Sequence, residues 1–249
     1  MDAHYWQARW ERNQIEFHQD SISPYLQRFL PELKLAPGAR VFVPLCGKSK
    51  DMLWLSAQGY PVLGVEVSLL AVAAFFNENA LPARRAPKGA FESWRSGEVE
   101  VLRGDYFALT PADLNDVAAV YDRAALVALP AEQRPRYACH MQAVLPATAR
   151  ILLVTLEYPQ AEWPGPPFAV APSEIETLFG ERFTIRDLYS EDALARKASF
   201  KEKGLTRLIA GRTDDPFLVT EMSGAELRAD PARLLDEAAA LAFGGGRRV

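Results

Sequence analysis

A glycine in a tight turn and an acid about 20 residues further on have the spacing that could bind a nucleoside. Residues 40–45 are a short apolar run that leads into Leu45-Cys46-Gly47, and a second run, 61–65, ends on Glu66. Strand, glycine turn, helix, strand and terminal acid make one half of a nucleotide-binding βαβ unit. Gly47 lets the backbone approach a ligand, and Glu66 can accept hydrogen bonds from a ribose diol. Glu66 could instead be a solvated acid at a strand end, but its offset from Gly47 favours the ribose role.

The same turn also limits the kind of nucleoside. It carries one glycine, and the G-x-G-x-x-G pattern that cradles a pyrophosphate is absent. This disfavours a nicotinamide or flavin oxidoreductase and favours a ligand without a pyrophosphate, such as S-adenosylmethionine. Cys46 in the turn is interpreted as a small apolar filler rather than a nucleophile, because no histidine partner can be assigned to it.

Three other strand ends carry polar side chains, at Asp105-Tyr106, Asp122-Arg123 and Glu157-Tyr158. In an open parallel sheet, ligands bind at the carboxyl ends of the strands, near the point where the strand order reverses. Asp105 could instead cap the turn that follows it. Arg123 could pair with Asp122 or with a surface acid. The sequence leaves both alternatives open.

Aromatic side chains are concentrated before the first strand, at Tyr5, Trp6, Trp10 and Phe17. Trp6 and Trp10 are four residues apart, so a helix would place them on one face. We expect residues of about 4–33 to form an aromatic lid over the open cleft, because these rings lie outside the βα repeat and must pack on something. Ring faces attract a sulfonium cation by roughly 0.5–2 kcal/mol. His18 is a candidate base, although a surface or core histidine is commoner.

The elements that must position these residues follow from hydrophobic periodicity and turn signals. Strands are predicted over 98–103, 117–121 and 150–156 besides the two runs above, with weaker candidates at 182–189 and 204–210. Helices are predicted over 22–33, 50–58, 69–79, 131–144 and 173–179. Gly59 should end the second of these, Ser68 should cap the third, and Ser173 with Glu176 should form a capping box on the last. Residues 81–97 are interpreted as a loop. The alternation predicts a mostly parallel sheet with helices on both faces.

Length and composition bound the class of protein. The 249 residues suit one domain, 1–211, with a C-terminal appendage, 212–249, outside the catalytic fold. A net charge of −4 and a pI of 5.5 argue against a nucleic-acid partner. No apolar run has the length of a membrane span, and the N-terminal residues do not look like a signal peptide. Two cysteines and three histidines favour neither a disulfide framework nor a zinc site. We expect a cytoplasmic, monomeric protein without a metal.

Several motifs together resemble the bacterial form of the thiopurine S-methyltransferase family. They are VFVPLCGKSKDM at 41–52, GVE at 64–66, DRAALVAL at 122–129, PGPPF at 164–168, and an opening segment with W-x-x-x-W at 6–10 and FHQ at 17–19. The resemblance covers residues 4–211. It implies a Rossmann-like class I S-adenosylmethionine-dependent methyltransferase fold, S-adenosylmethionine as the methyl donor and a small aromatic or heterocyclic thiol as the acceptor. Some bacterial members are linked to selenium and tellurium methylation.

The resemblance also implies roles for individual residues. Trp10, Leu45, Glu66 and Arg123 match positions that contact the cofactor, Asp105-Tyr106 matches the segment beside the adenine, and Phe17 matches a residue that contacts both cofactor and acceptor. Trp6 and Gly47 complete the predicted cofactor set, and Arg123 is predicted to hold the acceptor thiolate.

Two departures from the family pattern leave other functions open. Residues 190–203, which help to line the acceptor pocket in the family, are rich in Lys and Glu here, and the tail 212–249 extends past the usual end of the family. An inactive methyltransferase-like binding module is one alternative. A methyltransferase for a different small acceptor, or for protein or nucleic acid, is another.

Overall fold

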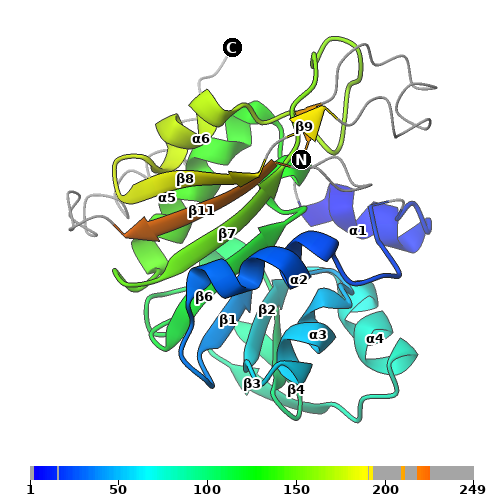
Figure 1. Ribbon diagram of the computed structural model, residues 1–249. Coiled ribbons are helices and arrows are strands. Elements are labelled where there is room, and N and C mark those ends of the chain that lie inside the picture. The colour runs from blue at the N-terminus through cyan, green and yellow to red at the C-terminus, as the bar shows by residue number, and fades with distance from the viewer. Residues whose placement is uncertain (1–2, 16, 190, 193–208, 211–217, 225–249) are drawn as a thin grey trace, which may run out of the picture.

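The computed structural model describes residues 3–15, 17–189, 191–192, 209–210 and 218–224. Among these residues, nine strands form one sheet (Figure 1). In spatial order they are β3 (Arg84–Lys88), β4 (Phe91–Ser96), β5 (Val99–Arg103), β2 (Val62–Glu66), β1 (Arg40–Val43), β6 (Val117–Arg123), β7 (Arg150–Thr155), β11 (Leu218–Gly224) and β8 (Phe183–Tyr189). A small antiparallel pair is formed by β9 (Glu191–Asp192) and β10 (Ile209–Ala210).

The centre of the sheet is parallel, from β5 through β2, β1 and β6 to β7. The strand order reverses between β1 and β6, because the chain runs outward from β1 to β2 and then returns to the other side of β1. The carboxyl ends of β1 and β6 therefore flank the position where ligands bind in such sheets.

Helices cover both faces of this sheet (Figure 1). One face carries α2 (Pro24–Phe29), the 3-10 turn η1 (Leu30–Leu33), α3 (Asp51–Ala57) and α4 (Leu69–Glu78). The other carries α5 (Arg134–Val144), α6 (Pro172–Phe179) and the 3-10 turns η2 (Tyr106–Ala108) and η3 (Leu126–Ala128). A further 3-10 turn, η4 (Ala131–Gln133), leads into α5, and α1 (Ala3–Glu11) lies against α4.

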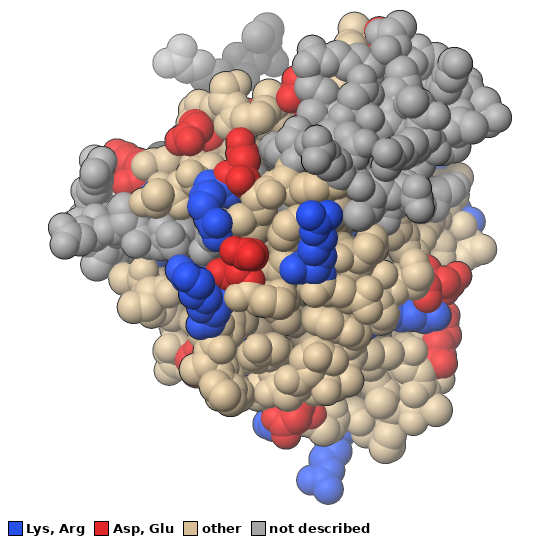
Figure 2. Space-filling view, in the orientation of Figure 1, with Lys and Arg blue, Asp and Glu red and all other residues tan. Residues whose placement is uncertain are grey.

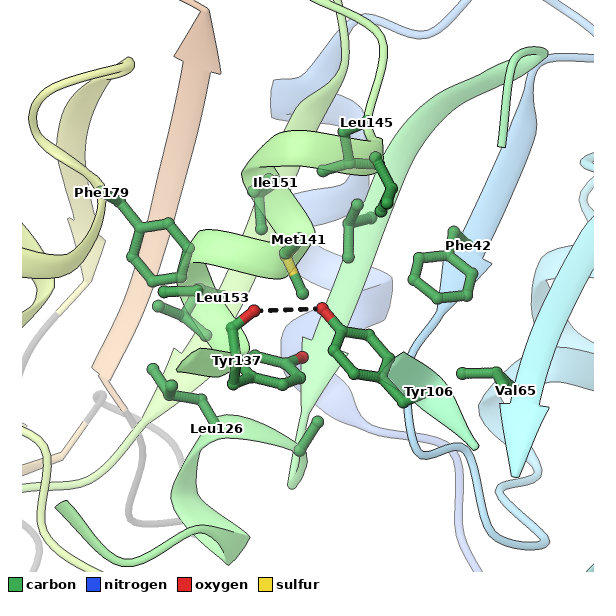
Figure 3. Close-up of a cluster of buried hydrophobic side chains, with 14 of the residues drawn as sticks. Phe42, Val65, Tyr106, Leu126, Tyr137, Met141, Leu145, Ile151, Leu153 and Phe179 are labelled. Atoms are coloured by element: carbon green, nitrogen blue, oxygen red, sulfur yellow. Dashed lines mark hydrogen bonds between the residues drawn. The ribbon is translucent and has the colours of Figure 1, made fainter. Parts of the chain in front are cut away.

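The alternation of side chains along each strand divides the buried residues into two cores. In β1, Val41 and Val43 pack on the side of α3 and α4, whereas Phe42 packs on the side of α5. Figure 3 shows the second of these cores, where Phe42 and Val65 from the sheet lie in the same cluster as Tyr137 and Met141 from α5. The mostly parallel sheet with helices on both faces is thus confirmed.

The interpretation of residues 81–97 as a loop is wrong, because they form the antiparallel strands β3 and β4. Gly89 and Gly97 have φ of 59° and 55° and make the tight turns on either side of β4. Phe91 and Trp94 are buried, which gives β4 a core-facing side. Pro87 lies on β3, at the edge of the sheet, where its missing N–H is tolerated.

Two helix predictions also need correction. The helix expected over 22–33 is a six-residue α-helix followed by a 3-10 turn, in which Pro31 lacks the N–H that a continuing α-helix would use. Ser173 and Glu176 do not form a capping box, because α6 begins one residue earlier, with Ala171 as its N-cap. Ser68 caps α4 as predicted: its side chain accepts a hydrogen bond from Ala71 N.

The prediction that the whole of 212–249 lies outside the catalytic fold is wrong for one segment of it. Residues Leu218–Gly224 form β11, which lies between β7 and β8 and is antiparallel to both (orange in Figure 1). Its residues pair with β7 from Leu218 opposite Thr155 to Ser223 opposite Arg150. This strand therefore belongs to the central sheet. Residues 226–242, whose Ala, Leu and charged residues are typical of a helix, lie outside the described residues, as does most of the strand candidate 204–210.

Within the described residues, every helix is too short or too polar to cross a membrane. Figure 2 shows basic and acidic side chains interspersed on the face of the molecule seen in Figure 1, with no single-sign area among the atoms it colours.

The position of β11 predicts that it is needed for stability. A chain that stops after Phe217 should lose the hydrogen bonds to both neighbouring strands, and at about 1 kcal/mol for each bond the free energy of unfolding should fall by at least about 3 kcal/mol. A chain that stops after Gly224 is the matched control, since it keeps every described strand. Urea unfolding followed by circular dichroism compares the two, and equal midpoints would contradict the assignment.

Candidate functional site

The carboxylate of Glu66 joins the ends of the two strands predicted to hold the nucleoside. Its Oε2 atom accepts a hydrogen bond from Gly47 N at 2.9 Å, and its Oε1 atom accepts one from Ser68 N at 2.8 Å. Burial raises the pKa of Glu66, although these backbone N–H groups lower it. Each oxygen makes one of these bonds, so lone pairs remain on both for the two hydroxyls of a ribose. The acid therefore fits the predicted ligand.

Both strand ends that flank the reversal continue into turns with unusual backbone angles. After β1, Leu45 has φ of 44° and Gly47 has φ of 52°, and after β6, Ala124 has φ of 74°. For a residue other than glycine, the left-handed region costs roughly 1 kcal/mol or more, and such residues are concentrated at ligand sites. The two turns thus mark the same edge of the sheet that the strand order indicates.

The N-terminal part of the lid expected over 4–33 lies over the turn after β1, whereas its second part, α2 and η1, packs in the core on one face of the sheet. A Cβ atom built on Gly47 would come within 3.2 Å of Trp10 Cζ2, so the indole lies directly against this glycine. Phe17 contacts both tryptophans edge to face, with ring centroids 5.6 Å from those of Trp6 and Trp10. The structure therefore brings Trp6, Trp10, Phe17 and Gly47 together, as the sequence predicts.

Asp105 and Tyr106 follow β5, but their side chains differ in position. Asp105 is exposed, and its Oδ1 accepts a hydrogen bond from Phe107 N at 3.0 Å, so it caps η2, which was one of its two alternatives. The Tyr106 ring is buried in the core, stacks on Tyr137 with centroids 4.8 Å apart, and donates its hydroxyl hydrogen bond to Tyr137 O at 3.2 Å (Figure 3). The Tyr106 ring is therefore a packing group, and within this pair Asp105 is the exposed side chain at the edge.

Arg123 ends β6 with only 9% of its side chain exposed. Its Nη1 atom lies 3.6 Å from Oδ2 of Asp51, the first residue of α3. The partner is thus neither Asp122 nor a surface acid. The guanidinium lies at the carboxyl edge of the sheet, where a positive charge can attract an anionic acceptor.

Asp122 points to the opposite face of the sheet and holds the turn that follows. Its Oδ1 atom accepts from Ala125 N and Leu126 N, both at 3.2 Å, and its Oδ2 atom accepts from the Tyr137 hydroxyl at 2.7 Å. Burial raises the pKa of Asp122 to about 6 in spite of these hydrogen bonds. Asp122 therefore stabilises the left-handed turn at Ala124.

Charged side chains lie where the chain leaves the aromatic rings, next to the turn after β1. His18 Nε2 lies 3.3 Å from Asp20 Oδ1, which also lies 3.4 Å from Lys50 Nζ, and Lys48 Nζ lies 2.8 Å from Glu78 Oε1. Burial, followed by the Lys48 ammonium, lowers the pKa of His18. These contacts connect the end of the lid to the turn after Gly47.

The Pro-rich loop after β7 packs on the turn after β6. Phe168 N donates to Val127 O at 2.7 Å, and the Tyr158 hydroxyl donates to Pro167 O at 2.7 Å. Glu157 is half-buried beside Tyr158. This loop therefore borders the same edge of the sheet as Arg123.

Asp51 was not predicted from the sequence as a residue of the site. An acid in the first turn of a helix is common, because its negative charge is stabilised by the positive end of the helix dipole. Its burial, with 1% exposed, and its contacts with residues far along the chain depend on how the sheet pairs. Hydrophobic periodicity does not show whether an acid at the start of a helix is buried, so it could not single out Asp51.

Comparison with known structures identifies the fold. The chain is similar to the Burkholderia thailandensis 1,6-didemethyltoxoflavin-N1-methyltransferase, solved with S-adenosylhomocysteine, with a TM-score of 0.59 and 13% identity over 90% of this chain and 87% of that one. It is also similar to the N-methyltransferase NodS from Bradyrhizobium japonicum, solved with S-adenosylhomocysteine, with a TM-score of 0.57 and 11% identity over 88% and 98%. At these identities the likeness concerns the fold, which is that of a class I S-adenosylmethionine-dependent methyltransferase.

Sequence comparison gives the family. The family model described as thiopurine S-methyltransferase (TPMT) matches residues 1–212. The chain is 51% identical over 208 residues to the thiopurine S-methyltransferase of Nitrosospira multiformis, which is 84% of this chain and 94% of that protein. It is 52% identical over 209 residues to that of Pseudomonas entomophila, or 84% and 96%. The chain therefore belongs to the thiopurine S-methyltransferase family. Its methyl donor is S-adenosylmethionine, and the resemblance found in the sequence is confirmed.

Glu66→Gln tests the ribose role. The amide retains an oxygen but loses the charge, so hydrogen bonds to a charged acceptor, each contributing roughly 1.5–3 kcal/mol, should weaken. We expect the Kd for S-adenosylhomocysteine to rise at least about tenfold in isothermal titration calorimetry. Glu92→Gln, on the antiparallel strand β4, is the control. An unchanged Kd for Glu66→Gln would remove Glu66 from the site.

Asp122→Asn tests the buried acid. Its pKa is about 6 in the folded protein against an ordinary value of 3.8, so the folded state binds a proton that the unfolded chain releases. This contribution to stability is complete below the ordinary pKa and is lost as the pH rises through about 6. The wild type should therefore lose stability between about pH 4 and pH 7, by an amount on the order of 2 kcal/mol from this group, and the variant should show a flatter dependence. Denaturant unfolding at several pH values measures both slopes, and parallel curves would contradict the prediction.

Proposed function

We propose that this protein transfers the methyl group of S-adenosylmethionine to the sulfur of a small aromatic or heterocyclic thiol, and that Arg123 holds the acceptor as its thiolate. The observation that carries this proposal is the nearly buried guanidinium at the carboxyl end of β6, beside the turn that faces Glu66. The family and its relatives, which are named as thiopurine S-methyltransferases, support the choice of a thiol.

The chemistry requires little from an acid or a base. Bound S-adenosylmethionine supplies the methyl group as a substituent of a sulfonium. An aromatic thiol is appreciably ionised near neutral pH, so the protein has to align the two reactants and exclude water. Alignment can lower the barrier by up to roughly 7–11 kcal/mol.

The lid and the Pro-rich loop suit this task. An anion meets a cation and two neutral sulfides result, so a site poor in water favours the reaction. Trp6, Trp10 and Phe17 bring three mutually packed rings to the glycine turn. The acceptor would enter between this aromatic cluster and Arg123.

Arg123→Ala tests the role of the guanidinium. A positive charge within 4–6 Å commonly lowers the pKa of an acid by about 1–3 units. Its loss should therefore raise the apparent pKa of the acceptor in the pH–rate profile by that amount and slow turnover near neutrality. The matched control is Arg84→Ala, at an exposed position on β3, which should leave both unchanged.

The assay follows S-adenosylhomocysteine with thiophenols, thiopurines, selenols and tellurite as acceptors. Turnover with thiols supports the proposal, and turnover with selenium or tellurium species would extend it. If no thiol is methylated, the acceptor assignment fails. If Arg123→Ala keeps the wild-type rate and pH profile, Arg123 has a structural role only.

A further inference from the structure

We propose that Asp51 is a positioning residue that fixes the guanidinium of Arg123 for the acceptor. This inference rests on the proposed function, because it concerns how the same Arg123 is aimed. Asp51 does not reach the reacting atoms in this scheme and acts through Arg123 alone.

Three groups from different parts of the chain converge on the Asp51 carboxylate. Ser23 N donates to Oδ1 at 2.7 Å, the Tyr121 hydroxyl donates to Oδ2 at 3.0 Å, and Arg123 Nη1 lies 3.6 Å from Oδ2. Asp51 is 1% exposed. Two hydrogen bonds thus fix both oxygens before the guanidinium approaches one of them.

The alternation of β6 explains why this acid meets Arg123. Tyr121 and Arg123 are two residues apart, so they project from the same face of the sheet, and Tyr121 packs in the core on the side of α3. Asp51 begins α3, which follows the cofactor turn. Ser23 is the N-cap of α2, the first helix after the aromatic segment. The carboxylate therefore connects the acceptor arginine to both the cofactor turn and the start of α2, which follows the aromatic rings.

The distance of 3.6 Å suits a positioning role. It is longer than the 2.7–3.2 Å of a good N–H···O hydrogen bond, so the interaction is chiefly a charge attraction. Among the described residues, the Arg123 guanidinium has this ion pair as its contact and donates no side-chain hydrogen bond to the protein. Its donors are thus left for a ligand, while the nearby negative charge holds the cation in place.

A role in folding alone is the competing explanation, because removing one member of a buried ion pair commonly destabilises a protein. The two explanations differ in what they predict for the reaction. Loss of a purely structural acid would lower stability and would leave the pH dependence of the surviving enzyme unchanged. Loss of a positioning acid would change the ionisation of the bound acceptor.

The experiment compares Asp51→Asn with the wild type, using thiophenol as the acceptor. Asparagine keeps an oxygen for Ser23 N and removes the charge. We expect kcat to fall at least about tenfold and the apparent pKa of thiophenol in the pH–rate profile to rise, in the same direction as in Arg123→Ala. The Kd for S-adenosylhomocysteine should change less than about twofold. In the Arg123→Ala background, Asp51→Asn should cause no further shift of the profile.

Asp116→Asn is the matched control, since this exposed acid pairs with Arg40 near the opposite ends of the strands and should leave the profile unchanged. Tyr121→Phe removes one of the two hydrogen bonds to Asp51 and should cause a smaller change in the same direction. If Asp51→Asn does not fold, Tyr121→Phe decides the question.

Three results would overturn the inference. They are an unchanged pH profile, a fall in the apparent pKa of thiophenol, which would show that Asp51 attenuates the arginine, or a crystal structure of Asp51→Asn with Arg123 in its wild-type position. The last result needs no turnover, so it tests the inference even if the wild type methylates no thiol. That failure would count against the proposed function separately.

Discussion

The site depends on one carboxylate that ties two strand ends together. Glu66 accepts backbone N–H groups from Gly47, in the turn after β1, and from Ser68, which caps α4. These bonds hold the turn, the acid and the start of a helix in one arrangement before any ligand arrives. Because the Glu66 carboxylate is buried, a hydrogen bond that it accepts from a hydroxyl group is stronger than the same bond in water. Because this hydrogen-bond acceptor is already in position, ligand binding does not have to order the carboxylate.

Strand β6 distributes two adjacent charges to opposite faces of the sheet. Asp122 turns toward α5, where the Tyr137 hydroxyl and two backbone N–H groups hold it, and Arg123 turns toward α3, where Asp51 lies. The first shapes the turn and the second presents a cation at the edge of the sheet. The period of two in a strand thus separates Asp122, which supports the turn, from Arg123, which we propose holds the acceptor, although the two are neighbours in sequence.

The parts of the fold that sequence reasoning predicted are those with local signals. The spacing of Gly47 and Glu66, the cap at Ser68 and the apolar run of β7 each follow from a few neighbouring residues. The hairpin of β3 and β4 was missed because its Pro, Arg and Gly content is typical of loops, and only its pairing with β5 makes it sheet. Asp51 was missed for the same reason: its partners are Ser23, Tyr121 and Arg123, and pairing between distant segments brings them together. The Tyr106 ring was assigned to the edge from its sequence position, whereas packing against Tyr137 turns it inward.

The place of β11 has a consequence for the order in which the protein is made. In the described sheet β8 pairs with β11 alone, and β11 follows it by roughly 30 residues along the chain. During synthesis, β7 therefore has an unpaired edge until β11 has left the ribosome. Over the same period β8 lacks the one strand with which it pairs in the described sheet. An open edge is where unwanted strands from other chains add. Nascent chains of this protein thus remain exposed to aggregation on that side of the sheet until β11 has been synthesised.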